Sequence, residues 1–80
     1  MTNKILKLVE KVMEVNENTK HDVFFNIVPH VKWCDIRIYK GGWEKEVRNK
    51  IEDIRFHYDE YYKKEDYDKI INRLEELLND

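Results

Sequence analysis

Residues 32–40, KWCDIRIYK, alternate between two kinds of side chain along the whole stretch. One set of alternate positions is apolar and small or branched: Cys34, Ile36 and Ile38. The other set is large or charged: Trp33, Asp35, Arg37 and Tyr39. Successive side chains of a strand point to opposite faces of a sheet, so the first set predicts a core face and the second a surface. Because large aromatic residues on a surface often mark a contact region, this strand indicates both the centre of the fold and a candidate binding site.

Two further strands are predicted, one on each side of this central strand. Residues 21–28 carry bulky apolar side chains at both sets of alternate positions, and Pro29, which cannot donate to a sheet, ends them. Gly41-Gly42 then supplies the positive φ angles of a tight turn. The apolar spacing after that turn fits either a helix or a strand, and we interpret residues 43–50 as a charged excursion followed by a strand at residues 52–58.

Both ends of the chain have the apolar periodicity of amphipathic helices. Near the N-terminus the apolar residues recur at spacings of three and four: Ile5, Leu8, Val12 and Val15. The polar residues 16–19 end this helix, and Thr2 is its predicted N-cap. A second helix is predicted at residues 65–78 with Asp59 as a plausible N-cap. Its apolar stripe is long and regular: Tyr67, Ile70, Ile71, Leu74, Leu77 and Leu78.

The order of these elements predicts an α+β fold consisting of a helix, a three-stranded antiparallel meander and a helix (αβββα). Residues 1–80 form one domain, since domains rarely subdivide below about 100 residues. Each helix has one apolar stripe, so we expect both helices on one face of the sheet. The opposite face then carries the predicted partner-binding residues: Phe24, Trp33, Arg37, Tyr39, Arg55 and His57.

Composition narrows the class of protein. The chain has 15 basic and 17 acidic residues and a formal net charge of −2, whereas nucleic-acid-binding domains are usually clearly basic. The single cysteine, Cys34, excludes an internal disulfide and fits a reducing compartment. The N-terminus lacks the apolar run of a signal peptide, and no stretch approaches the roughly 20 apolar residues that span a bilayer. We therefore expect a soluble cytoplasmic protein without membrane contact.

The sequence contains no pattern that predicts catalysis or metal binding. Cys34 with a histidine is the one candidate nucleophilic pair, but the strand alternation buries Cys34, and a reactive thiolate needs an exposed, electropositive setting. The histidines and Cys34 lack the short paired spacings, such as C-x-x-C, that bring two ligands to one metal ion. We therefore predict that the protein is not an enzyme and holds neither a metal nor a cofactor.

The surface row predicts binding of a macromolecule. Trp, Tyr and Arg are enriched at the energetic centres of protein interfaces, which favours a protein partner. A symmetric homodimer through the same sheet face is an equally consistent interpretation. A purely structural alternative is that Arg37 stacks on Trp33 or Tyr39 as a surface cation–π pair.

Nucleic-acid binding is the alternative function. Helix, three strands, helix is also the element order of double-stranded RNA-binding domains, which place lysines at the start of their second helix, where this chain has Lys63 and Lys64. Acidic residues follow these lysines at once, however, and phosphate contacts dominate the affinity of such domains. Stacking of single strands on Trp33 and Tyr39 is a variant of the same alternative.

Residues 21–46, HDVFFNIVPHVKWCDIRIYKGGWEKE, and the closing residues 66–78, DYDKIINRLEELL, resemble a group of short uncharacterised proteins encoded by phages and prophages of low-GC Gram-positive bacteria. In that group a helix precedes a VFF strand, an IRIYKGGW strand follows, and a Leu/Ile-rich helix ends the chain. The resemblance brings no assigned activity and no functional residues. It implies a setting in which small accessory proteins bind and block a host protein. Some small anti-CRISPR inhibitors share this element order, so inhibition of a host defence protein joins the expected functions.

Overall fold

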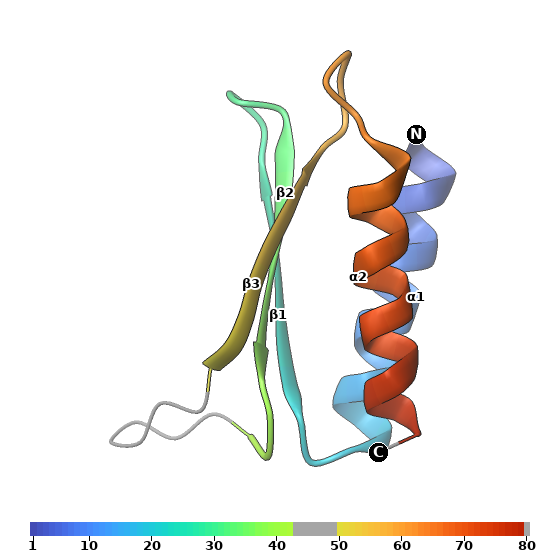
Figure 1. The fold of residues 1–80 in the computed structure, drawn as a ribbon, viewed down its shortest axis with the longest axis vertical. Helices are drawn as coiled ribbons and strands as arrows, with labels where there is room; N and C mark the ends of the chain where they lie inside the picture. The colour runs from blue at the N-terminus through green and yellow to red at the C-terminus, as the bar shows by residue number, and fades with distance from the viewer. Residues whose placement is uncertain (43–49, 80) are drawn as a thin grey trace.

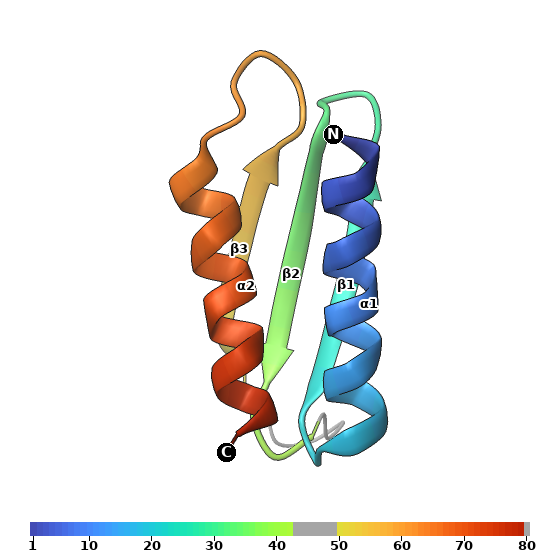
Figure 2. The same cartoon turned by 90° about the vertical axis from the view of Figure 1, so that its right-hand side faces the viewer.

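The computed structural model describes residues 1–42 and 50–79, which fold in the predicted order. The elements along the chain are α1 (Thr2–Asn18), β1 (Asp22–Val28), β2 (Trp33–Tyr39), β3 (Lys50–His57) and α2 (Lys64–Leu78). The strands form one antiparallel sheet in the order β1-β2-β3, and both helices lie on the same face of it (Figures 1 and 2). The predicted αβββα fold with a three-stranded meander is therefore confirmed. The excursion predicted at residues 43–50 lies, up to residue 49, outside the described residues.

The core lies between the two helices and the inner face of the sheet, which we define as the face that the helices cover. Its residues include the predicted core face of β2, and Cys34, Ile36 and Ile38 are fully buried. Phe56 of β3 meets Tyr67 of α2 edge to face, with ring centroids 5.6 Å apart. The Tyr67 hydroxyl donates a 2.8 Å hydrogen bond to the Lys4 carbonyl, which joins α2 to α1.

A second polar link joins α2 to the sheet at the rim of the core. The Arg73 Nε atom of α2 lies 2.6 Å from the Glu52 carboxylate of β3, and both side chains are largely buried. Glu52 is on the inner face, directly across the ladder from Ile38. The pairing lets a carboxylate occupy an inner-face position because its charge is matched there.

The glycine turn after β2 has the predicted backbone. Gly41 and Gly42 have φ angles of +82° and +104°, which side chains of L-residues rarely adopt. The Gly41 N–H donates a 2.9 Å hydrogen bond to Nδ1 of His21, just before β1. Because β1 begins at Asp22, His21 lies just outside the strand predicted at residues 21–28. Its hydrogen bond joins the turn after β2 to the turn after α1.

Both predicted helix caps are wrong. Thr2 is the first residue of α1 and Met1 is its N-cap, without a side-chain cap hydrogen bond. Asp59 lies four residues before Lys63, the N-cap of α2. Its Oδ1 instead accepts a 3.0 Å hydrogen bond from the Tyr61 N–H, because an aspartate can close a turn with the backbone two residues on. Residues 58–63 consequently form a loop between β3 and α2.

Candidate functional site

The six predicted partner-binding residues all lie on the outer face of the sheet, the face turned away from both helices (Figure 1). The antiparallel register brings them together in pairs. Phe24 of β1 lies opposite Arg37 of β2, and Trp33 of β2 lies opposite His57 of β3. Within the part of the chain that the structure describes, no helix covers this face. The side chains form two separate groups, one toward each end of β2.

The first group, which we call the Trp33 cluster, consists of Trp33, Arg55, His57 and Tyr61. The guanidinium carbon of Arg55 lies 4.4 Å from the centroid of the Trp33 ring, which is a cation–π contact. The rings of Trp33 and His57 meet at 90° with centroids 5.7 Å apart, and those of His57 and Tyr61 meet at 64° and 6.0 Å. Tyr61 is 64% exposed. The cluster is therefore a row of rings that neighbouring side chains hold in place and that solvent reaches.

Arg55, rather than Arg37, stacks on Trp33. His57 is directly opposite Trp33, so Arg55, two residues earlier on β3, is its diagonal neighbour. Arg37 instead lies opposite Asp53, and its Nε atom is 3.8 Å from the Asp53 carboxylate. The sequence alone did not provide this pairing, because the register between β2 and β3 decides it.

The second group, which we call the Phe24 cluster, consists of Phe24, Tyr39 and Arg37. The Phe24 and Tyr39 rings are tilted by 51° with centroids 5.2 Å apart. Phe24 is 45% exposed even though it contacts another aromatic ring. This cluster is a second apolar contact surface on the same face, at the end of the strands nearer the glycine turn.

Asp35 separates the two clusters and corrects the expectation that it faces solvent. It lies between Asn26 and Arg55 in the ladder, and only 9% of it is exposed. The neighbouring side chains of the three strands bury a residue in the middle of a sheet even on a face that no helix covers. Its negative charge contributes to the state of Cys34: burial, and then the Asp35 carboxylate, raises the pKa of this thiol to about 11. A fully buried thiol that ionises so late is unsuited to act as a nucleophile.

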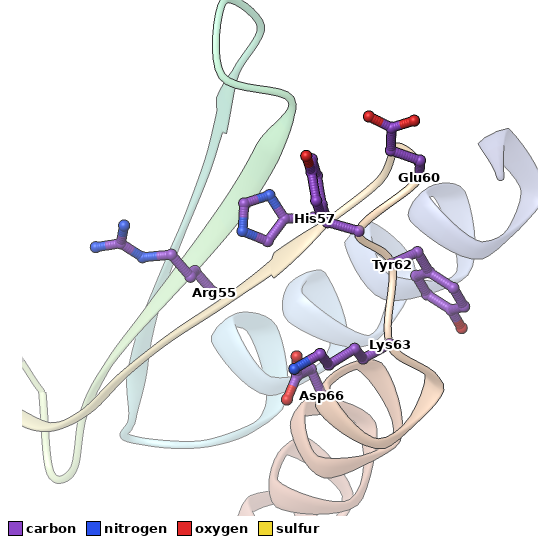
Figure 3. Close-up of a pocket in the computed structure, with 7 residues that line it drawn as sticks. Arg55, His57, Glu60, Tyr62, Lys63 and Asp66 are labelled. Carbon is purple, nitrogen blue, oxygen red and sulfur yellow. The ribbon is translucent and has the colours of Figure 1, made fainter.

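A hollow of about 660 Å³ lies beside the Trp33 cluster, between the end of β3, the following loop and the first turn of α2 (Figure 3). Its lining mixes rings with charges of both signs: Arg55, His57, Glu60, Tyr61, Tyr62, Lys63 and Asp66. Two buried polar atoms here have no hydrogen-bond partner among the described residues, Nδ1 of His57 and the hydroxyl of Tyr62. Because these two atoms are buried, what the hollow offers to a ligand group is an aromatic wall and charged groups of both signs.

Sequence reasoning found His57 and Arg55 but missed the loop residues of this hollow. Asp59 as the cap of the last helix places Tyr61 and Tyr62 in its first turn and so hides them, while Lys63 is predicted only as a contact to phosphate. The usable signal was that the apolar stripe of that helix begins only at Tyr67. Aromatic residues before the stripe are outside the helical pattern: Tyr61 is exposed, whereas Tyr62 still packs against the core.

The structure brings no metal-ligand set together in residues 1–42 and 50–79. The histidines and the cysteine lie in different surroundings: His21 bonds the glycine turn, His30 is in the turn after β1, Cys34 is in the core, and His57 is in the Trp33 cluster. No group of three or more His, Cys, Asp or Glu side chains among these residues could hold an ion. No described helix is both long and apolar enough to cross a bilayer.

No protein-family model, curated protein or solved structure matches the chain. The resemblance of residues 21–46 and 66–78 to phage-encoded proteins thus stays a prediction. The function has to be argued from the outer face and from the hollow beside it.

Proposed function

We propose that this protein is a non-catalytic binding module that contacts a protein partner through the outer face of its sheet. The observation that carries the proposal is the Trp33 cluster, a solvent-accessible row of Trp, Arg, His and Tyr side chains beside an open hollow. Interface hot spots are enriched in these Trp, Tyr and Arg types. The side chains already contact one another, so binding would immobilise few new rotamers, and this lowers the entropic cost of association.

The hollow suggests how a partner is anchored. Its volume is ample for a large side chain of a partner, and the Tyr61 and His57 rings give it an aromatic wall. An inserted side chain could stack on the Tyr61 ring, which is 64% exposed, or pair with a charged group of the lining such as Lys63 or Asp66. Hot spots typically fill such pockets, while the flatter surface around them, here the Phe24 cluster, excludes water.

Charge favours a protein partner over a nucleic acid. Among the described side chains of the outer face, the carboxylates of Asp22, Asp35 and Asp53 outnumber the guanidiniums of Arg37 and Arg55. Arg37 is also close to the Asp53 carboxylate. Nucleic-acid affinity depends on cationic side chains that are free to replace counterions along the phosphates, and this face offers few.

The start of α2 does not supply the positive charge that the outer face lacks. Lys64, one of the two lysines expected to meet phosphates in the double-stranded RNA alternative, is paired with Asp68 at 3.2 Å. Glu65 and Asp66 occupy the first turn of the same helix. Among the described residues the start of α2 and the outer face thus offer little of the basic surface that RNA binding requires, which supports a protein as the favoured partner.

The phage setting that the sequence motifs imply would make a host protein the partner, and a host defence protein in particular. Blocking such a target needs only tight binding, and the outer face provides for binding without catalysis. Inhibition is the form of activity that we expect in that setting.

The decisive experiment is capture of a partner from host-type lysate with tagged protein, with and without nuclease. Replacing two hot-spot side chains in Trp33→Ala/Arg55→Ala should lower affinity for the captured protein by about 30-fold or more, since a hot-spot residue contributes at least ~2 kcal/mol. The matched control is Glu65→Ala/Lys69→Ala, which removes two exposed charged side chains from α2. Equal capture by both variants would refute the outer face as the binding surface. Loss of the captured band after nuclease treatment would mean that the partner is a nucleic acid.

A further inference from the structure

The edge strand β1 turns alternate backbone groups away from β2, and the described residues satisfy only some of them. Asn16 of α1 occupies only the first of them: the Val23 N–H donates to Asn16 Oδ1 at 2.7 Å, and Asn16 Nδ2 donates to the Val23 carbonyl at 3.0 Å. Val23 therefore points its N–H and C=O away from β2. Since these groups alternate sides along a strand, those of Phe25 and Ile27 point to the same open edge. No hydrogen bond from the described residues reaches them.

The β1 edge also lacks the features by which proteins protect such edges. Natural edge strands usually carry charged side chains, a proline or a bulge within the strand. The one charged residue of β1 is Asp22 at its start; residues 23–28 carry no charge, and Pro29 comes only after the strand has ended. The opposite edge strand, β3, has charged residues along its length, including Glu52, Asp53 and Arg55. The two edge strands thus differ in their described residues, and β1 is the better suited of the two to pair with another strand.

Two exposed apolar side chains of α1, Leu6 and Met13, which we call the α1 ridge, lie next to this edge. Leu6 is 60% exposed and Met13 49% exposed, and their spacing of seven residues places them on the same side of α1. Asn16, three residues after Met13, is on that side as well, and its hydrogen bonds to Val23 show that this side faces β1. Figure 2 shows α1 over β1, with α2 away from this edge.

The ridge and the open edge have the same centre. Asn16 is level with Val23, which its side chain bonds. The midpoint between Leu6 and Met13 is six to seven residues before Asn16, or about 10 Å along a helix. Asn26, the middle of the open edge, is three residues after Val23, or about 10 Å along a strand. One two-fold axis through Asn26 would therefore relate both features to copies of themselves.

We propose that a second copy of this chain binds here, with β1 pairing antiparallel to β1 of the partner subunit about an axis at Asn26. Phe25 then exchanges both of its main-chain hydrogen bonds with Ile27 of the partner subunit, and the reciprocal pair does the same. Leu6 packs against Met13 of the partner subunit. Ile27, 47% exposed in the single chain, becomes buried beneath the joined sheet.

A second copy satisfies this surface better than a foreign strand does. A bound peptide would pair with the edge but leave the α1 ridge in water, whereas the two-fold axis covers both. Residues 23–28 of the two strands carry no charge, so they also meet without repulsion between like charges. The short edge alone is small, so burial of the ridge is needed to approach the ~1,200 Å² of a stable interface. The axis leaves the outer face open, and the dimer does not depend on the proposed function.

Sedimentation velocity and light scattering test the dimer directly. The wild-type protein should have twice the chain mass of 9.9 kDa at concentrations of about 10 to 500 µM. Ile27→Lys, which places a charge on the open edge, and Leu6→Glu/Met13→Glu, which disrupts the ridge, should both be monomers with a native circular dichroism spectrum. Tyr61→Lys, a change at a more exposed side chain far from the axis, should remain a dimer.

Hydrogen exchange gives a second readout that needs no variant. The Phe25 and Ile27 amides should be protected at high concentration and should lose protection on dilution, while the Asn26 amide, which faces β2, stays protected. A wild-type monomer across the whole concentration range overturns the proposal. So does a dimer in which these two amides exchange freely, or one that Trp33→Ala/Arg55→Ala disrupts while Ile27→Lys does not, because that dimer would use the outer face.

Discussion

Neighbouring residues of β2 occupy opposite environments. Cys34, Ile36 and Ile38 are fully buried beneath the helices, whereas Arg37 is exposed and Trp33 and Tyr39 are partly exposed on the outer face. The inner residues contribute to stability by burial of apolar surface. The outer residues contact one another in small ring and cation clusters that bury far less. In this one strand, the inner residues mainly determine stability and the outer residues carry the proposed binding. Substitutions at adjacent positions should therefore affect one property without the other.

The largest expected effect is on the inner face. Ile36→Ala removes a fully buried side chain from the middle of the central strand, and a change of this kind lowers the free energy of unfolding by about 2 to 5 kcal/mol. Its neighbour gives the matched control, because Arg37→Ala removes an exposed side chain and should lower that free energy by less than about 1 kcal/mol. Urea denaturation at neutral pH measures both. Similar losses for the two variants would contradict the division between the faces.

Alkaline pH should weaken the inner face next. Burial raises the pKa of the Cys34 thiol from 9.0 in the unfolded chain to about 11 in the folded protein, so the folded state favours the neutral thiol. The stabilisation is complete below pH 9 and is lost as the pH rises from 9 to 11, by about 2 to 3 kcal/mol in total.

The measurement for this prediction is the free energy of unfolding as a function of pH, with Cys34→Ala as the control. Burial also raises the pKa of Tyr67, so part of the alkaline loss remains in the control. The difference between the two proteins isolates the thiol. A wild-type curve that runs parallel to the Cys34→Ala curve between pH 9 and 11 would mean that the thiol is not protected from ionisation.

The alternation of β2 was enough to predict the inner face, because burial follows local periodicity. Ile5, Leu8, Val12 and Val15 predicted α1 for the same reason, and each packs at or in the core. The side-chain contacts on the outer face depend on the register between neighbouring strands, and no single residue of the sequence determines that register. The six candidate residues could therefore be placed on one face, whereas the partner of Trp33 could not be identified.

The loop after β3 shows a second limit of sequence reasoning. Asp59 is a good N-cap residue, and nothing local distinguishes a cap from a turn that uses the same carboxylate. The hollow depends on that distinction, because Tyr61 and Tyr62 line it only when they precede the helix. The Asn16 side chain is another such case, since its contacts with Val23 join residues in different elements.

The smallest expected effect lies within the outer face and tests that register. Trp33 and Arg55 should show a coupling free energy of about 0.5 to 1 kcal/mol in a double-mutant cycle of Trp33→Ala and Arg55→Ala, because an exposed cation–π contact contributes that much. The matched cycle pairs Trp33→Ala with Arg37→Ala and should show no measurable coupling, since Arg37 is opposite Asp53. Both cycles are measured by urea denaturation. Coupling of Trp33 to Arg37 rather than to Arg55 would mean that β3 pairs with β2 in another register. The side-chain contacts of the Trp33 cluster and of the hollow beside it would then differ from those described. The large loss for Ile36→Ala would still be expected, because the inner face of β2 would remain fully buried.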